Sequence, residues 1–96
     1  MTTLSLDRDH FIIIITPDVM PDADEFDFWS SIFLAKNDIT LGDFEQGADR
    51  HMQRFYFQQQ PFELHYEYYG DNIWIAPSGV ESQQLLEKLS RYLRER

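Results

Sequence analysis

Apolar and polar residues alternate most regularly along residues 62–69, which read FELHYEYY. A period of two is typical of a β-strand with one buried face. Every second residue from Phe62 would then point into a core. The opposite side of the same strand would carry Glu63, His65, Glu67 and Tyr69.

Five further segments are predicted to be strands by their apolar or alternating residues. They are residues 4–6, 10–16, 39–46, 51–58 and 73–76. The unbroken isoleucine run in the second of these is typical of a strand buried on both faces. Gly42 interrupts the third and favours a β-bulge or a close backbone approach at that point.

Two turns set the predicted register of the last three strands. A two-residue turn at Gln59–Gln60 would place Arg54 opposite His65. A turn at Gly70–Asp71, where the glycine favours type II′ geometry, would place Trp74 beside Glu67. This register gathers a candidate face of charged and aromatic residues: Met52, Arg54, Tyr56, Glu63, His65, Glu67, Tyr69 and Trp74.

Residues 22–37 show the spacing of a helix. Asp22 and Glu25 form a capping-box pattern at its start, and acidic residues suit the first turn. Large apolar residues follow at intervals of three and four from Phe26 to Phe33. Such a stripe is typical of a helix packed on a core.

A second helix is predicted over residues 78–96, where Ser78 and Glu81 form another capping-box pattern. An apolar stripe runs along it: Val80, Leu85, Leu86, Leu89, Tyr92 and Leu93. Glu87 precedes Arg91 by four residues, which is the spacing of an ion pair within one helix.

The predicted element order is β-β-α-β-β-β-β-α. Strands linked by hairpins, with one helix inserted and one appended, favour an α+β fold. We expect a two-layer sandwich with an antiparallel sheet of four to six strands and two helices. With 96 residues and no internal repeat or linker, the sequence indicates a single globular domain over residues 1–96.

The charge of the chain is strongly uneven. Residues 1–49 contain eleven acids and two bases, so the net charge of −9 lies in the first half. Nucleic acid and anionic membrane surfaces repel such a domain, and we expect neither as a partner. The acidic half would serve solubility or attract a basic protein.

The absence of cysteine removes disulfides, thiolate metal sites and a cysteine nucleophile. The apolar run at residues 11–15 is far shorter than a signal sequence or a membrane span requires. Both observations agree with a cytoplasmic protein.

Glu63, His65 and Glu67 suggest a metal or acid–base site, because two carboxylates flank an imidazole on one side of a strand. Arg54, predicted opposite His65, would oppose a cation, and the flat face of a strand offers no dry pocket. We therefore expect no catalytic, cofactor-binding or metal-binding residue. A metal-dependent or acid–base enzyme centred on His65 is the alternative.

The candidate face instead has the composition of a protein interface. Trp74, Tyr56 and Met52 beside Arg54 are residue types enriched at binding hot spots. This favours a non-enzymatic interaction module that binds a partner protein or a second copy of itself. The same aromatic residues would have no such role if a loop or helix covered them.

Three features carry a resemblance to a known family: GADRH at residues 47–51, LHYEYY at residues 64–69, and Trp74. Together they resemble a family of small, acidic, uncharacterised proteins of gammaproteobacteria, a domain of unknown function. The resemblance covers roughly residues 40–76. It implies a bacterial cytoplasmic protein and transfers no catalytic residue.

Overall fold

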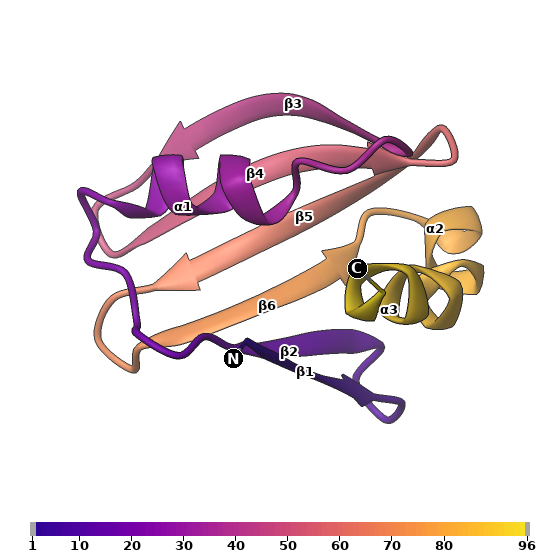
Figure 1. Ribbon diagram of the computed structural model, residues 1–96, viewed down its shortest axis with the longest axis horizontal. Coiled ribbons are helices and arrows are strands. Elements are labelled where there is room, and N and C mark those ends of the chain that lie inside the picture. The colour runs from indigo at the N-terminus through magenta and orange to yellow at the C-terminus, as the bar shows by residue number, and fades with distance from the viewer. Residues whose placement is uncertain (1, 96) are drawn as a thin grey trace.

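The computed structural model describes residues 2–95. Its strands are β1 (Thr3–Asp7), β2 (Ile12–Thr16), β3 (Ile39–Gln46), β4 (Arg50–Phe57), β5 (Gln60–Glu67) and β6 (Asn72–Pro77). Its helices are α1 (Phe26–Phe33), α2 (Val80–Gln84) and α3 (Leu86–Arg94). The strands form one open antiparallel sheet in the order β1-β2-β6-β5-β4-β3 (Figure 1). The predicted α+β fold is confirmed, and the sheet has the largest of the expected numbers of strands.

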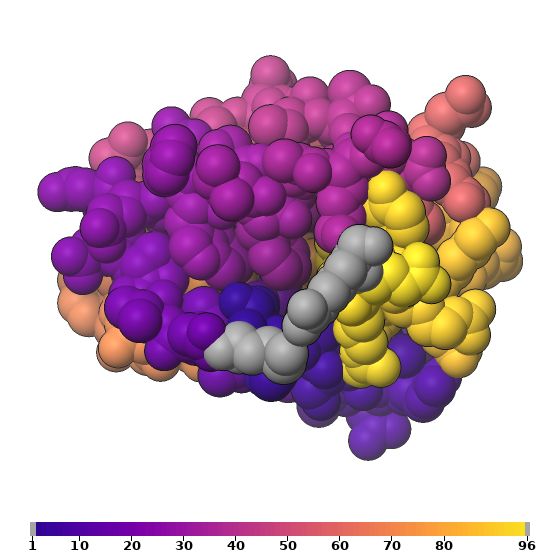
Figure 2. Space-filling view, viewed as in Figure 1, coloured from indigo at the N-terminus to yellow at the C-terminus, as the bar shows by residue number. Residues whose placement is uncertain are grey.

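Helices α1 and α3 both lie on one face of this sheet (Figure 1), and Figure 2 shows how they cover it. The core lies between the helices and that face. Its buried side chains come from the inner positions of the four central strands and from the helical segments: Ile13, Ile15, Phe26, Leu34, Phe55, Phe57, Phe62, Leu64, Tyr66, Ile73, Ile75, Leu86, Leu89 and Leu93.

The isoleucine run of β2 is buried on one face only. Ile13 and Ile15 lie in the core, whereas Ile14 is 40% exposed. The prediction of burial on both faces is therefore wrong. The reason is that the helices supply a second layer on one side of the sheet only.

Strand β2 pairs with β6, the last strand of the chain. Ile13 lies opposite Ile75, and Ile15 lies opposite Ile73, all four on the core side. Between β2 and the edge strand β3, the chain crosses the sheet through α1 (Figure 1). The β1–β2 hairpin therefore pairs with a strand that comes from near the end of the sequence.

The β4–β5 hairpin turns at Gln58–Gln59, one residue earlier than predicted. Both glutamines have positive φ angles, 52° and 69°, as a type I′ turn requires. Arg54 consequently pairs with Glu63, and the predicted pairing of Arg54 with His65 is wrong by two positions. A shift of two leaves each side chain on its predicted face.

The β5–β6 connection is also wider than predicted. Strand β5 ends at Glu67, and residues 68–71 form the loop, so His65 rather than Glu67 lies opposite Trp74. The positive φ angle belongs to Asp71, at 52°, which excludes the predicted type II′ turn with a left-handed glycine. The Glu67 carboxylate accepts a hydrogen bond from the Gly70 N–H at 2.8 Å and so holds the loop.

Helix α1 is shorter than the predicted segment 22–37. A turn precedes it, in which the Glu25 carboxylate accepts a hydrogen bond from the Asp22 N–H at 3.0 Å, as one half of a capping box would. Phe26 and Leu34 are buried, but Ile32 is 61% exposed. The predicted stripe is therefore wrong at Ile32, which points away from the sheet.

The predicted helix over residues 78–96 is two helices that meet at Leu85, and its last predicted residue, Arg96, lies outside the described residues. Its start lies one residue later than the Ser78–Glu81 pattern indicates, because the Gly79 N–H donates to Ser82 Oγ at 2.9 Å. Val80 is exposed rather than part of the apolar stripe.

Both edges of the sheet have a feature that hinders pairing with another strand. At β1, the Arg94 guanidinium donates a hydrogen bond to the Leu4 carbonyl at 3.0 Å. At β3, the register shifts between Leu41 and Phe44, and acidic Glu45 follows. Bulges and charged side chains are the usual means of keeping edge strands from pairing with other chains.

Glu87 on α3 forms its ion pair with Arg8, in the β1–β2 turn, at 3.2 Å. The prediction placed its partner at Arg91. The Arg8 guanidinium, first through its hydrogen bonds and then through its charge, holds the pKa of Glu87 below its ordinary value. Because the folded pKa is the lower one, the pair stabilises the fold above the unfolded pKa and loses this contribution as pH falls through the folded pKa.

The substitution Arg8→Ala is expected to raise the pKa of Glu87 toward its ordinary value. Arg91→Ala is the matched control and should raise it less, since Arg91 acts only through its more distant charge. Carboxyl-carbon NMR titration of Glu87 measures both. A larger shift in Arg91→Ala would show that the predicted pair within the helix is the dominant one.

Candidate functional site

The sheet face opposite α1 and α3 has no second layer within residues 2–95, and we call it the open face. From the register, its members on the four central strands are Ile12, Ile14, Thr16, Arg50, Met52, Arg54, Tyr56, Pro61, Glu63, His65, Glu67, Asn72, Trp74 and Ala76. One row of side chains crosses all six strands: Ser5, Ile14, Trp74, His65, Met52 and Glu45. This row forms the middle of the open face.

The centre of the row is a stack of two rings. His65 lies parallel to Trp74, with the ring centroids 5.1 Å apart and an interplanar angle of 16°. The His65 side chain is only 16% exposed although no helix covers it. Its neighbours on the strands enclose it sideways, and Nδ1 is buried with no hydrogen-bond partner in the described structure.

Glu63 connects the charged groups beside this stack. One of its oxygens lies 3.0 Å from His65 Nε2, and the other lies 3.4 Å from Arg54 Nη1 and 3.3 Å from Ser78 Oγ. Arg54 also approaches the carboxylate of Glu45 at 3.9 Å. Two carboxylates therefore share one guanidinium, and the face is charged at this side and apolar toward β2.

The three residues of the alternative metal or acid–base site do not all meet in the structure. Glu67 turns toward the loop and binds the Gly70 N–H, while Glu63 contacts His65, Arg54 and Ser78. Residues 2–95 contain no group of three or more ligand side chains that could hold a metal ion. The Glu–His–Glu set of the alternative is therefore divided between two different hydrogen-bonded groups.

The bulge in β3 brings the backbone of Gly42 close to Tyr56 and Arg54 on the neighbouring strand β4. A side chain at Gly42 would place its Cβ only 3.1 Å from the Tyr56 ring and 3.3 Å from the Arg54 carbonyl. The predicted bulge or close approach at Gly42 is confirmed. On the core side, the buried Gln53 amide donates to the carbonyls of Gly42 at 3.0 Å and Arg54 at 2.9 Å.

A polar pair formed by a buried histidine and a half-buried tyrosine, which the sequence pattern did not indicate, lies on the core side of the same strands. His51 is buried, and the Tyr68 hydroxyl lies 2.8 Å from its Nδ1 and donates to the Gly47 carbonyl at 3.1 Å. His51 Nε2 lies 3.2 Å from the Ala23 carbonyl. These contacts attach the loop before α1 to the sheet and have a structural role.

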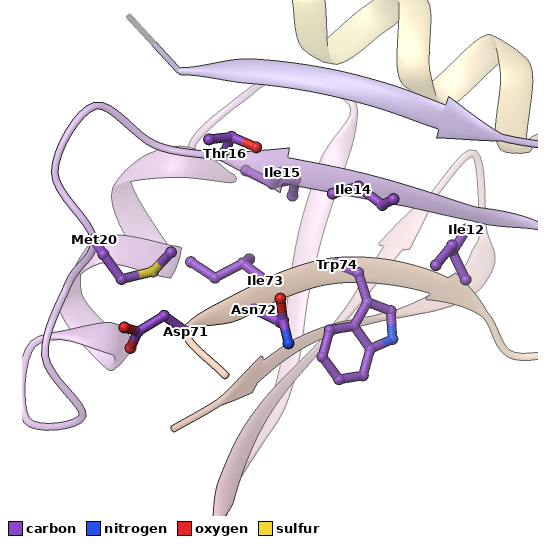
Figure 3. A pocket seen from close by; sticks show the side chains of 9 residues that line it. All are labelled: Ile12, Ile14, Ile15, Thr16, Met20, Asp71, Asn72, Ile73 and Trp74. Atoms are coloured by element: carbon purple, nitrogen blue, oxygen red, sulfur yellow. The ribbon is translucent and has the colours of Figure 1, made fainter. Parts of the chain in front are cut away.

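A pocket of about 280 Å³ lies at the seam between β2 and β6 (Figure 3). Strand β2 contributes isoleucine side chains, β6 contributes Trp74, and Met20 comes from the loop that follows β2. Its full lining is Ile12, Ile14, Ile15, Thr16, Met20, Asp71, Asn72, Ile73 and Trp74. The open face therefore includes a hollow at its apolar side.

Several carboxylates lie near Tyr66 and Tyr68, at the end of the sheet where β6 begins, and one of them, Asp71, lines this pocket. Burial first, and then the charges of Asp71, Asp22 and Glu25, raise the pKa of Tyr66. Burial, followed by the charges of Asp49 and Asp24, raises the pKa of Tyr68. We call this group of carboxylates the acidic end: Asp22, Asp24, Glu25, Asp49 and Asp71.

The structure brings together nearly all of the predicted candidate face. Every member except Tyr69 lies on the open face; Tyr69 belongs to the β5–β6 loop and is 85% exposed. The sequence pattern did not place Ile12 and Ile14 there, because an unbroken apolar run gives no sign of which face is covered. Their position depends on the pairing of β2 with β6.

Gln53→Leu is expected to lower the free energy of unfolding by about 1–3 kcal/mol, because the carbonyls at the bulge lose their buried donor. Gln46→Leu, at an exposed position of β3, is the matched control and should change it by less than about 0.5 kcal/mol. Urea denaturation measures both. Equal effects would contradict the role given to the Gln53 amide.

Adding Zn²⁺, Mn²⁺ or Mg²⁺ is expected to leave the melting temperature unchanged, because Glu63 and Glu67 are engaged by other groups. An ion that binds only the folded state would raise it. Differential scanning fluorimetry with and without each ion measures the effect. A rise that His65→Ala removes would restore the metal-site hypothesis.

Comparison with known proteins gives one match. The family model described as "Protein of unknown function (DUF3630)" matches residues 1–94. No curated protein and no solved structure matches the chain. Among the described residues, no helix has both the length and the apolar character that crossing a membrane requires.

Proposed function

The chain belongs to the DUF3630 family of proteins of unknown function, and we propose that it is a non-enzymatic protein-interaction module that binds through its open face. One observation carries this proposal: a six-stranded sheet is covered by helices on one side only. The other side presents Trp74, Tyr56 and Ile14 next to its charged residues. We also assign it to the bacterial cytoplasm, as the resemblance of its sequence implies.

The open face has the chemical make-up of a binding surface. Trp74 and Met52 lie in its central row, and Arg54 lies beside them. Tryptophan, methionine and arginine are enriched at protein interfaces, and hot spots are typically aromatic residues or arginine surrounded by other contacts. Trp74 and Met52 lie in one row with Arg54 beside it, so one partner surface can contact all three.

Contacts among the side chains of the open face restrict their conformations before any partner binds. The stacking of His65 on Trp74 and the contacts of Glu63 with His65 and Arg54 restrict these side chains. Side chains that are already ordered lose less conformational entropy on association. Binding to the open face would therefore keep more of the free energy gained from burial.

A different protein is a better occupant than a second copy of the chain. The net charge is −9, so two copies repel each other at close approach. The acidic end adds local negative charge where β6 begins, and this increases the repulsion when two copies approach at that end. A partner with basic groups avoids this repulsion.

Ile14→Glu is expected to abolish capture of the partner from a lysate of the source bacterium, because it places a charge in the middle of the open face. Ile32→Glu is the matched control: it makes the same change at a more exposed isoleucine on α1, across the sheet. It should leave capture unchanged. Affinity purification followed by quantitative mass spectrometry measures both.

Circular dichroism of both variants establishes that they fold before capture is compared. A partner lost equally from Ile14→Glu and Ile32→Glu would contradict the proposal. So would a partner lost only from Ile32→Glu, since that result would place the binding surface on α1.

A further inference from the structure

We infer that the pocket at the β2–β6 seam receives an apolar side chain from a basic segment of the partner protein. The inference rests on the proposed function and names the chemistry of the partner. It follows from three features of the structure: an apolar hollow at the seam, a carboxylate in the lining of that hollow, and sheet edges that hinder the addition of a strand.

The hollow is lined mainly by hydrocarbon. Ile14 and Trp74 lie opposite each other across the seam, and Met20 reaches in from the neighbouring loop (Figure 3). Its volume of about 280 Å³ is at or below the lower limit for pockets that enclose a whole small-molecule ligand. One or two side chains of a protein fill such a space, and Met20 can adjust to their shape.

The pocket has one charged lining residue, and its charge is negative. That residue is Asp71, in a chain whose net charge is −9. A segment with lysine or arginine on either side of an apolar residue would place a cation near the Asp71 carboxylate. Exposed pairs of this kind add little affinity each, but they orient the segment and accelerate its association.

The features of the two sheet edges favour docking through a side chain over docking as an added strand. Arg94 occupies the Leu4 carbonyl at the β1 edge, and the β3 edge contains a bulge. A segment that added itself as a further strand would have to displace these features. Docking through a side chain in the seam leaves both edges unchanged.

The test uses three short synthetic peptides with blocked ends: Lys-Lys-Leu-Lys-Lys, Lys-Lys-Gly-Lys-Lys and Glu-Glu-Leu-Glu-Glu. The reporter is the indole N–H signal of Trp74 in ¹⁵N-resolved NMR spectra, and Trp29, on the helix side of the sheet, is the internal control. We expect the first peptide to shift the Trp74 signal but not that of Trp29. The glycine peptide should bind severalfold more weakly, and the acidic peptide should not bind.

Two variants localise the effect. Asp71→Asn should weaken binding of the leucine peptide about two- to fivefold, as loss of an exposed ion pair does. Ile14→Gln should remove the Trp74 shift, and Ile32→Gln, on the opposite face, should leave it intact.

Three results overturn the inference. Equal binding of the leucine and glycine peptides would mean that charge alone is recognised. Binding without a shift of Trp74 would place the segment elsewhere. A Trp74 signal that shifts on dilution of the free protein would identify a second copy as the occupant.

The inference and the proposed function fail separately. If the peptides do not bind while Ile14→Glu still abolishes capture, the pocket assignment is wrong and the open face remains the binding surface. If Ile14→Glu has no effect on capture either, both are wrong.

Discussion

The antiparallel pairing of β2 with β6 is the constraint on which the rest of the structure depends. It joins the first hairpin to strands formed from the end of the chain. Closing so long a loop costs conformational entropy before any contact forms. The burial of Ile13, Ile15, Ile73 and Ile75 offsets this cost, since each fully buried isoleucine contributes about 1.5–3 kcal/mol.

The same pairing shapes both faces of the sheet at once. On the core side it completes the layer that α3 covers, and on the other side it brings Ile14 against Trp74. Trp74 in turn shields His65, which lets a nearly buried imidazole lie on a face with no second layer. The open face and the hydrophobic core therefore both depend on this one strand pairing.

The sequence predicted the fold class, the faces of β4 to β6 and the bulge at Gly42, because these depend on local periodicity and on glycine geometry. It did not predict which face of β2 is covered, since that depends on a partner strand far along the chain. The hairpin registers were each wrong by two. Gln58 and Gln59 adopt left-handed conformations that their residue type does not favour, and the Glu67–Gly70 hydrogen bond widens the next loop. Because both registers shifted by an even number of residues, the side chains of the predicted candidate face, apart from Tyr69, still share one side of the sheet.

The protection of the two edges has a consequence for the stoichiometry of any complex. An uncovered sheet with free edges can add strands repeatedly and grow into a fibre. Here Arg94 takes one carbonyl at the β1 edge and the bulge distorts the β3 edge, so both edges disfavour growth by strand addition. A partner bound on the open face would then complete a second layer without extending the sheet.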